Sequence, residues 1–212
     1  MIVERLDLGT QLVGFTEAWA RQREVHADVV AGRREDTVLL VEHAPVYTAG
    51  RRTTRADRPP GVEIVDVDRG GRITWHGPGQ LVAYPIVRLP EPIDVVDHVR
   101  RLEAAVMAPC ADLGVATEQV VGRSGVWIPG EGPPRKIAAI GVRVASGVTM
   151  HGLALNCDAD LTAYDRIVAC GLPDAAATSL TREAGRPVTV LDAAPLLAAH
   201  LREQLTRVRV TG

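Results

Sequence analysis

The sequence predicts an α+β fold in which one mixed β-sheet is flanked by helices. Strand-like runs occur in neighbouring pairs joined by glycine-containing turns, which is typical of hairpins. Three longer segments instead have the apolar spacing of amphipathic helices. These helices do not alternate strictly with the strands, as they would in a doubly wound parallel fold. We therefore expect a mixed sheet within a single domain that spans residues 1–212.

The first half of the chain begins with an expected strand at residues 2–8, "IVERLDL". Residues 10–30 are expected to form an amphipathic helix, and residues 37–43, "TVLLVEH", have the nearly continuous apolar pattern of a buried strand. A polar, arginine-rich loop follows at residues 48–61, and residues 62–89 are interpreted as strands around two glycine-rich turns. The expected inner face of the helix consists of Leu12, Phe15, Trp19 and either Val29 or Val30.

The second half contains two further expected helices. Residues 94–114 are expected to be helical, with Asp94 as N-cap and Pro109 as a kink or end. Residues 124–158 have the pattern of three strands, the last two joined by the tight turn "ASG". Residues 188–205 are predicted to form a last helix, with Asp192 capping it. The core-facing residues of this helix are expected to be Leu196, Leu197 and Leu201.

Composition excludes several classes of protein. The net charge of −2 offers no general attraction to nucleic acid or anionic lipid. No apolar run approaches the roughly 20 residues of a membrane span, and the first ten residues do not resemble a signal peptide. Three widely spaced cysteines suit a reducing cytosol better than a disulfide framework, so a cytoplasmic location is expected.

Lys136 is the only lysine beside 23 arginines. It lies in "RKIAAIGVRVASGV", which is predicted to be a strand, and strict alternation would place it on one face with Ala138, Ile140 and Val142. Lysine can lose its proton and act as a base, whereas arginine is effectively always protonated. The residues alone leave two alternatives open: a functional lysine, or a strand-end side chain that extends to water.

Cysteine residues are the candidate nucleophiles. Cys110 and Cys157 lie among apolar neighbours and are expected to be packing residues. Cys170 lies at the junction between a short apolar run and a Gly-Leu-Pro turn, where a thiol is accessible to substrate. A cysteine nucleophile needs a neighbouring cation or base to form its thiolate.

The usual base is histidine, and the chain contains six. His26, His98 and His200 lie on predicted helices among charged residues and are expected to be solvated. The better candidates lie in predicted strands or glycine turns: His43, His76 and His151. Lys136 is the other possible activator, and sequence spacing does not choose between them.

The glycine-rich stretch "DRGGRITWHGPGQLVAYP" could bring backbone amides close to a ligand. Arg69 and Arg72 could bind an anionic group, and His76 follows directly. The stretch matches neither a P-loop nor a dinucleotide fingerprint, and a single RGG between strands is unlike repeated RNA-binding segments. A pair of tight hairpins without function is the alternative. Isolated histidines without ligand spacing predict no metal site.

Five segments in order, "EHAPVYTAGR", "RGGRITWHGPGQLVAYPI", "RKIAAIGVRV", "HGLALNCD" and "ACGL…TSL", resemble the lipoyl(octanoyl) transferases over roughly residues 40–180. The resemblance implies the fold of the biotin- and lipoate-protein ligase catalytic domain. It also implies that Cys170 and Lys136 are the catalytic pair. The implied acyl-substrate contacts are Arg69, Gly70, Gly71, Arg72, Ile73, Thr74, Trp75, His76, Ala139, Ile140, Gly141, Gly152, Leu153 and Ala154.

The activity implied by the resemblance is transfer of an octanoyl chain from octanoyl-acyl carrier protein to a lysine of lipoyl domains, without a cofactor. The implied acceptors are the lipoyl domains of 2-oxoacid dehydrogenase complexes and the glycine cleavage H protein. Two positions depart from the family pattern: Ala169 stands where many members have proline, and Cys157 where many have a valine-like residue. The alternatives are an ATP-dependent lipoate- or biotin-protein ligase and a non-catalytic acyl-binding homologue.

Overall fold

The computed structural model describes residues 1–167 and 175–206. Its helices are α1 (Phe15–Val30), η1 (Arg55–Asp57), α2 (Val95–Asp112), η2 (Leu161–Arg166), α3 (Leu180–Ala184) and α4 (Val190–Thr206). Its strands are β1 (Ile2–Leu6), β2 (Thr37–Val41), β3 (Val46–Ala49), β4 (Ile64–Asp66), β5 (Ile73–His76), β6 (Gln80–Ile86), β7 (Glu118–Val120), β8 (Arg123–Ile128), β9 (Arg135–Ala145), β10 (Val148–Asn156) and β11 (Ala176–Ala177).

The larger sheet has the strand order β1-β2-β6-β10-β9-β8-β7, and β11 pairs with β9 outside this path. β1 pairs with β2, and β11 with β9, in parallel, whereas the other pairs are antiparallel. A smaller sheet has the order β4-β3-β5. The predicted α+β class with a mixed sheet is therefore confirmed.

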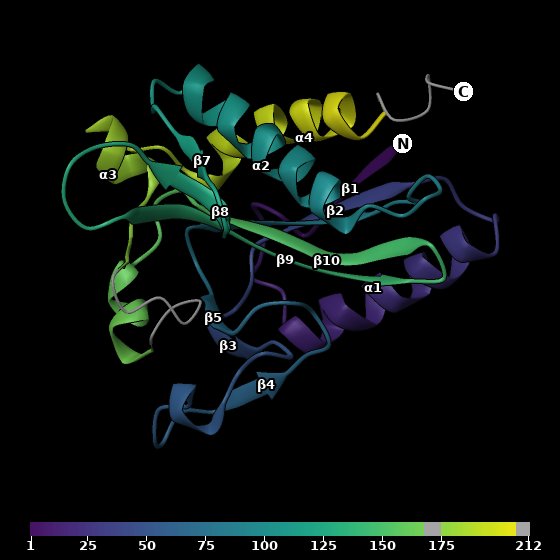
Figure 1. The fold of residues 1–212 in the computed structure, drawn as a ribbon, viewed down its shortest axis with the longest axis horizontal. Coiled ribbons are helices and arrows are strands. Elements are labelled where there is room, and N and C mark those ends of the chain that lie inside the picture. Colours follow the sequence, from purple (N-terminus) through teal and green to yellow (C-terminus); the bar gives the residue numbers. More distant parts are fainter. Residues whose placement is uncertain (168–174, 207–212) are drawn as a thin grey trace.

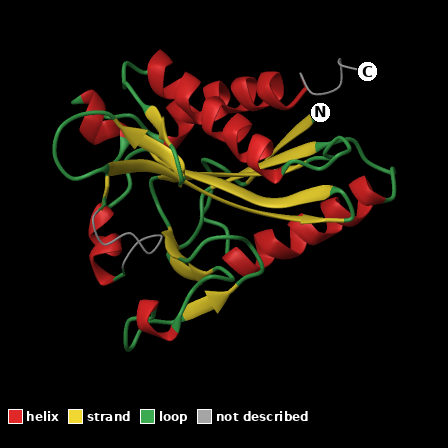
Figure 2. Cartoon of the chain, viewed as in Figure 1, coloured by secondary structure: helices red, strands yellow, loops and turns green. Residues whose placement is uncertain are grey.

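Helices cover both faces of the larger sheet, as Figures 1 and 2 show. α2 and α4 pack together on one face, over a core that includes Leu102, Leu153 and Leu197. α1 lies on the opposite face, where Val25 and Val29 pack against β2 and β6. The smaller sheet lies on the same side of the larger sheet as α1 (Figure 1).

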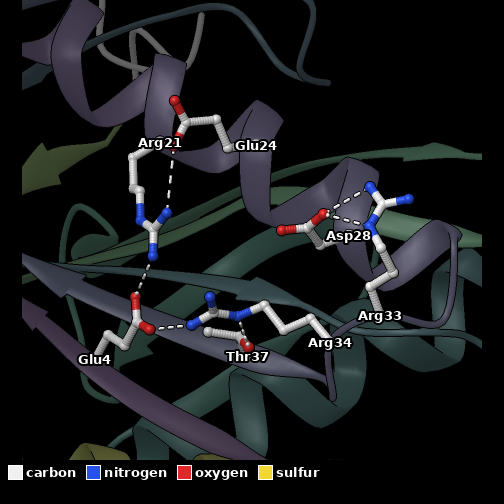
Figure 3. A network of polar contacts seen from close by, with 7 residues as sticks. All are labelled: Glu4, Arg21, Glu24, Asp28, Arg33, Arg34 and Thr37. Atoms are coloured by element: carbon white, nitrogen blue, oxygen red, sulfur yellow. Dashed lines mark hydrogen bonds and ion pairs between the residues drawn. The ribbon is translucent and has the colours of Figure 1, made fainter.

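Arginine side chains tie α1 to the edge of the larger sheet (Figure 3). Glu4 of β1 accepts hydrogen bonds from Arg21 on α1, at 3.2 Å, and from Arg34, which follows the helix. Arg34 also donates to Thr37 at the start of β2. The fork of guanidinium donors suits such shared pairing better than an ammonium group would.

The first helix is shorter than the sequence predicted. It begins at Phe15, with Gly14 as N-cap, and Leu12 remains 43% exposed. The preceding residues are held out of the helix because Val13 forms a β-bridge to His43. Tertiary pairing thus overrides the helical pattern at residues 10–14.

The other predicted elements agree with the structure, apart from two helix details, whereas β3, β7, β11, α3, η1 and η2 were not predicted. Asp94 caps α2 by accepting a hydrogen bond from the Asp97 amide, as predicted, but the helix continues past Pro109 to Asp112. In α4 the cap is Thr189, whose amide and hydroxyl both donate to Asp192. The predicted turn between β9 and β10 is confirmed and has positive φ at two successive residues, Ser146 and Gly147, as tight hairpins require.

None of the helices in the described residues is long and apolar enough to cross a membrane.

Candidate active site

A cavity of about 280 Å³ lies below the larger sheet, between β9 and β10 on one side and the loop leading into β5 on the other. Its lining brings together residues that lie far apart in the sequence. They are Phe15, Arg52, Arg69, Gly71, Arg72, Thr74, His76, Val82, Tyr84, Gly122, Arg123, Ser124, Lys136, Ala139, Ile140, Gly141, His151, Gly152, Leu153 and Ala154.

Most of the substrate contacts expected from the sequence line this cavity, but three do not. Thr74 and His76 face it from β5, whereas Ile73 and Trp75 point to the other side because side chains alternate along a strand. Gly70 lies behind the lining, and its amide donates to the Val142 carbonyl of β9. The role of the lining residues in binding substrate stays a prediction.

An irregular register in β9 corrects the predicted surroundings of Lys136. Opposite β8, Val126 pairs with Ala138 and Trp127 with Lys136, so Ile137 is an extra residue. Ile137 and Ala138 both enter the α2 and α4 core, and strict alternation is therefore broken between them and Lys136. The bulge turns Lys136 toward the cavity, on the side of Ala139 and Gly141.

The ammonium group of Lys136 is held by β8. Its Nζ donates to the Ser124 carbonyl at 3.0 Å and lies 4.5 Å from the centre of the Trp127 ring, a cation–π contact. Between these two residues, Gly125 has φ +112°, and a Cβ there would lie 2.6 Å from the Ala138 carbonyl and 3.2 Å from Lys136 Cε. The buried Glu103 of α2 fixes this glycine by accepting from its amide at 2.9 Å.

On β10, His151 has positive φ (58°), which is rare for a residue with a side chain. It stands where β10 passes Pro85 of β6, which has no amide hydrogen to donate to the ladder. The next residue is Gly152, where a Cβ would lie 2.3 Å from the Ala83 carbonyl. The side chain of His151 reaches across the cavity wall to Asp68, with 2.7 Å between Nε2 and Oδ1.

Arginines give the cavity a cationic rim. Arg69 is buried, and its guanidinium donates to the loop carbonyls of Gly70 and Arg72 and to the carbonyl and hydroxyl of Thr48 in β3, so it ties the glycine-rich loop to β3. Hydrogen bonds from Thr54 lower the pKa of Asp57, and its ion pair with Arg72, at 3.2 Å, adds to this effect. Arg52 is exposed at the mouth.

Three buried histidines on this side of the sheet are uncharged at neutral pH. Burial lowers the pKa of His43 to about 4 and that of His76 to about 3, with the neighbouring His43 adding to the effect on His76. Burial also lowers the pKa of His151, despite its hydrogen bond to Asp68. The ring centres of His43 and His76 are 5.8 Å apart.

Among the other three histidines, which were all expected to be solvated, one prediction is wrong. His98 was expected to be solvated on its helix but is only 3% exposed, and burial lowers its pKa to about 4. His200 pairs with Asp112, and His26 contacts the carbonyls of Ala145 and Val148.

The cysteines that the structure describes are packing residues, as predicted. Cys110 and Cys157 have no exposed surface, and burial raises the pKa of both thiols, to about 12 for Cys110. Cys170, the predicted nucleophile, lies outside the described residues. The residues that follow this segment lie beside Lys136, because Ala177 pairs with Lys136 and the Thr178 amide donates to the Lys136 carbonyl at 3.0 Å.

Residues 1–167 and 175–206 contain no group of three or more side chains arranged to hold a metal ion. Sequence reasoning missed several lining residues, among them Phe15, Tyr84 and Ser124. Phe15 is the only phenylalanine in an aromatic-poor chain, but its pattern was that of an ordinary helix core residue. Ser124 acts through its backbone carbonyl, which no side-chain pattern can reveal.

Comparison with known proteins identifies the family of this protein over most of its length. Residues 15–202 match the family model described as the lipoyl protein ligase A/B catalytic domain. This chain belongs to that family. A protein of Clavibacter sepedonicus named octanoyltransferase is 63% identical over 205 residues, covering 94% of this chain and 88% of the relative.

Solved structures of lipoate and biotin protein ligases share the fold. A bipartite lipoate protein ligase from Thermoplasma acidophilum superposes with a TM-score of 0.71 at 15% identity, covering 97% of this chain and 83% of the ligase. Biotin protein ligase from Aquifex aeolicus gives a TM-score of 0.54 at 10% identity, over 98% of this chain and 70% of that one. The predicted likeness to both classes of ligase is therefore confirmed at the level of the fold.

Proposed function

We propose that this protein transfers an octanoyl group from octanoyl-acyl carrier protein to a specific lysine of lipoyl domains, through a thioester on Cys170. The observation that carries the proposal is the cavity itself. It joins Lys136 to an apolar wall on the α1 side of the larger sheet, made by Phe15, Val82 and Ala154, and arginines also line it. An acyl chain needs such a wall, a carrier-bound thioester needs access from the mouth, and proton transfer needs the lysine.

The apolar wall supports a medium-chain acyl substrate. Burial of each methylene contributes about 0.8 kcal/mol, so an eight-carbon chain could contribute about 5 kcal/mol to binding. Ala139, Gly141 and Ala154 keep the wall free of large side chains beside Lys136. On the same estimate each methylene changes affinity only about fourfold, so decanoyl donors are also expected to react.

The proposed cycle has two acyl transfers. The Cys170 thiolate attacks the thioester carbonyl of the donor, and the carrier thiol leaves with a proton from Lys136. The acceptor amine then attacks the acyl-enzyme while neutral Lys136 takes the amine proton, which regenerates the thiolate and the ammonium. Because the donor is already activated, the cycle needs no ATP and no cofactor. We place this reaction in the cytoplasm, where cysteine thiols stay reduced.

The proposed acceptors are the lipoyl domains of 2-oxoacid dehydrogenase complexes and the glycine cleavage H protein. The relatives' name supports octanoyl transfer, and the description of the family model supports lipoyl proteins as acceptors. The likeness to lipoate and biotin ligases supports a second candidate, an ATP-dependent ligase, but at 10–15% identity it shows only the fold.

Mass spectrometry separates the candidates. The protein is mixed with octanoyl-acyl carrier protein without ATP and digested, and we expect an octanoyl adduct on the Cys170 peptide. Cys170→Ser should abolish turnover while the fold remains intact. Modification of a lipoyl domain only in the presence of ATP and free octanoate would identify a ligase instead. Reversible binding without an adduct would identify an acyl-binding protein.

Lys136→Arg tests the proton-transfer role. Arginine keeps the charge but does not release its proton near neutral pH. We expect slow acylation and still slower transfer to the acceptor amine in single-turnover measurements of the two steps. Rates near those of the wild type in both steps would show that Lys136 is not catalytic.

A further inference from the structure

A series of hydrogen bonds through two buried side-chain amides connects His76 to Thr178, in the described segment that begins at residue 175. His76 Nδ1 lies 2.7 Å from Gln80 Oε1, Gln80 Nε2 donates to Asn156 Oδ1 at 2.9 Å, and Asn156 Nδ2 donates to the Thr178 carbonyl at 2.9 Å. His76, Gln80 and Asn156 are at most 7% exposed. These hydrogen bonds cross from β5 to β6 and β10.

Backbone carbonyls at two points fix the orientation of both amides. The Thr178 carbonyl can only accept, so Asn156 must present its NH₂ to it and its Oδ1 to Gln80. Gln80 must then present its NH₂ toward Asn156, and the Trp75 carbonyl, 3.3 Å away, requires the same orientation. Oε1 of Gln80 is left facing His76, so Nδ1 of His76 must carry the hydrogen.

This assignment leaves Nε2 of His76 as an unprotonated acceptor. Among the described residues Nε2 has no hydrogen-bond partner, and His76 lines the cavity. Phe15 stacks on the ring at 6.2 Å, which leaves the ring edge as the polar surface. The charged or titratable groups that influence His76 are His43, Arg69 and His151, and all three oppose its protonation.

We propose that Gln80 and Asn156 are positioning residues that hold His76 as a neutral Nδ1–H tautomer, whose Nε2 accepts a hydrogen bond from the incoming acceptor amine. The inference rests on the proposed function and gives His76 and Lys136 different roles in it. His76 orients the amine, and Lys136 receives the proton.

The amine is the substrate group that fits this acceptor. Once Cys170 carries the acyl group it has no S–H to donate, and a thiol is in any case a weak donor. An amine has N–H groups and must point its lone pair at the thioester carbon, so one N–H must be held aside. A neutral histidine does this without removing the proton, because the buried ring protonates only at a pH of about 3.

The direct test is long-range ¹H–¹⁵N correlation NMR of the histidine rings, on the wild-type protein between pH 5 and 8. We expect His76 to give the Nδ1–H pattern throughout. An Nε2–H pattern, or titration near pH 6.5, would overturn the proposal. This measurement does not depend on catalysis, so it stays informative if the proposed function is wrong.

Gln80→Glu tests the positioning role. A carboxylate at residue 80 should raise the titration midpoint of His76 by roughly one to three pH units, because a nearby negative charge favours the protonated ring. Transfer from the acyl-enzyme to the amine should then decline as pH falls through that midpoint, since protonated His76 has no acceptor. Gln22→Glu is the matched control: Gln22 is equally buried but accepts from the His151 amide, and its substitution should leave the His76 midpoint unchanged.

His76→Leu separates the two half-reactions. We expect octanoylation of Cys170 to continue and transfer to a lipoyl domain to slow by about 100-fold, the typical effect of a misplaced reactant. Equal slowing of both steps would contradict the role assigned to His76. Absence of any adduct in the wild type would instead contradict the proposed function.

Discussion

The environment of Lys136 depends on single residues of β8. The Ser124 carbonyl and the Trp127 ring hold the ammonium from two sides, and Gly125 between them leaves room for the lysine stem. A carbonyl and an aromatic face orient a charge without supplying a counter-ion. In the proposed mechanism, Lys136 therefore stays available to the Cys170 thiolate.

Gly125→Ala should displace Lys136. The new Cβ would contact the Ala138 carbonyl and the lysine stem in a backbone conformation that alanine rarely adopts. We expect kcat/KM to fall by roughly 10- to 100-fold and stability by about 1–3 kcal/mol, measured by steady-state kinetics and urea unfolding.

Gly132→Ala is the matched control for this substitution. Gly132 has a similar φ of +103°, but a Cβ there would meet nothing within 4 Å. Gly132→Ala should lose part of the stability that Gly125→Ala loses, because alanine is strained at positive φ, and it should keep full activity. Equal loss of activity in both variants would mean that the Gly125 effect is not due to contact with Lys136.

The thiols should differ in reactivity. Burial raises the pKa of Cys110 to about 12 and raises that of Cys157, so neither forms thiolate between pH 6 and 9. Iodoacetamide applied to the native protein should modify Cys170 first, as mapped by mass spectrometry. Cys110→Ser and Cys157→Ser should keep most activity. Rapid labelling of Cys157, with Cys170 untouched, would show that the nucleophile is misassigned.

At the scale of elements, the segment between β3 and β4, residues 50–63, lies beside the cavity, which Arg52 lines. It contains η1 and four arginines, of which Arg58 pairs with Asp66. Arg51 and Arg52 are exposed, and Arg52 lines the mouth. Because the net charge is −2, this chain could attract an acidic partner only through such a local group of positive charges.

Reversal of Arg51 and Arg52 to glutamate should weaken carrier docking. We expect a higher KM for octanoyl-acyl carrier protein at low salt, with kcat less affected and the difference shrinking as ionic strength rises. Arg33→Glu is a suitable control, because Arg33 is exposed after α1 and pairs with Asp28 (Figure 3). Unchanged kinetics of the double variant at low ionic strength would remove this loop from the docking surface.

At the scale of the whole molecule, buried neutral histidines link stability to pH. Burial lowers the pKa of His43 and His98 to about 4 in the folded protein, whereas the unfolded value is about 6.5. The unfolded chain therefore binds more protons below pH 6.5. Stability should be full above that pH and should fall as the pH drops from 6.5 toward 4.

Urea unfolding at pH 7 and pH 5 measures this linkage. Each of the two histidines should cost roughly 2 kcal/mol at pH 5. His98→Leu should reduce the loss, because His98 takes no part in the proposed chemistry. Its Nε2 is buried without a partner in the part of the chain that the structure describes, so the variant should be no less stable at pH 7. A loss of the same size in the variant would assign the pH dependence to other groups.

The sequence by itself determined the fold class and most of the elements, and it indicated the candidate site residues. Apolar periodicity and turn residues act locally, so the strand pairs, the Asp94 cap and the β9–β10 turn were predictable. The lone lysine and the glycine-rich stretch were visible for the same reason: composition and spacing are properties of the chain.

Only the tertiary structure decided how these residues meet. A one-residue bulge in β9 reverses the face on which Lys136 lies, and it depends on pairing with β8 rather than on local preference. The start of α1 was moved by a bridge between Val13 and His43, 30 residues apart. Burial of His98 and the amide chain that orients His76 likewise depend on contacts between distant segments, because desolvation and hydrogen-bond direction exist only once the chain has folded.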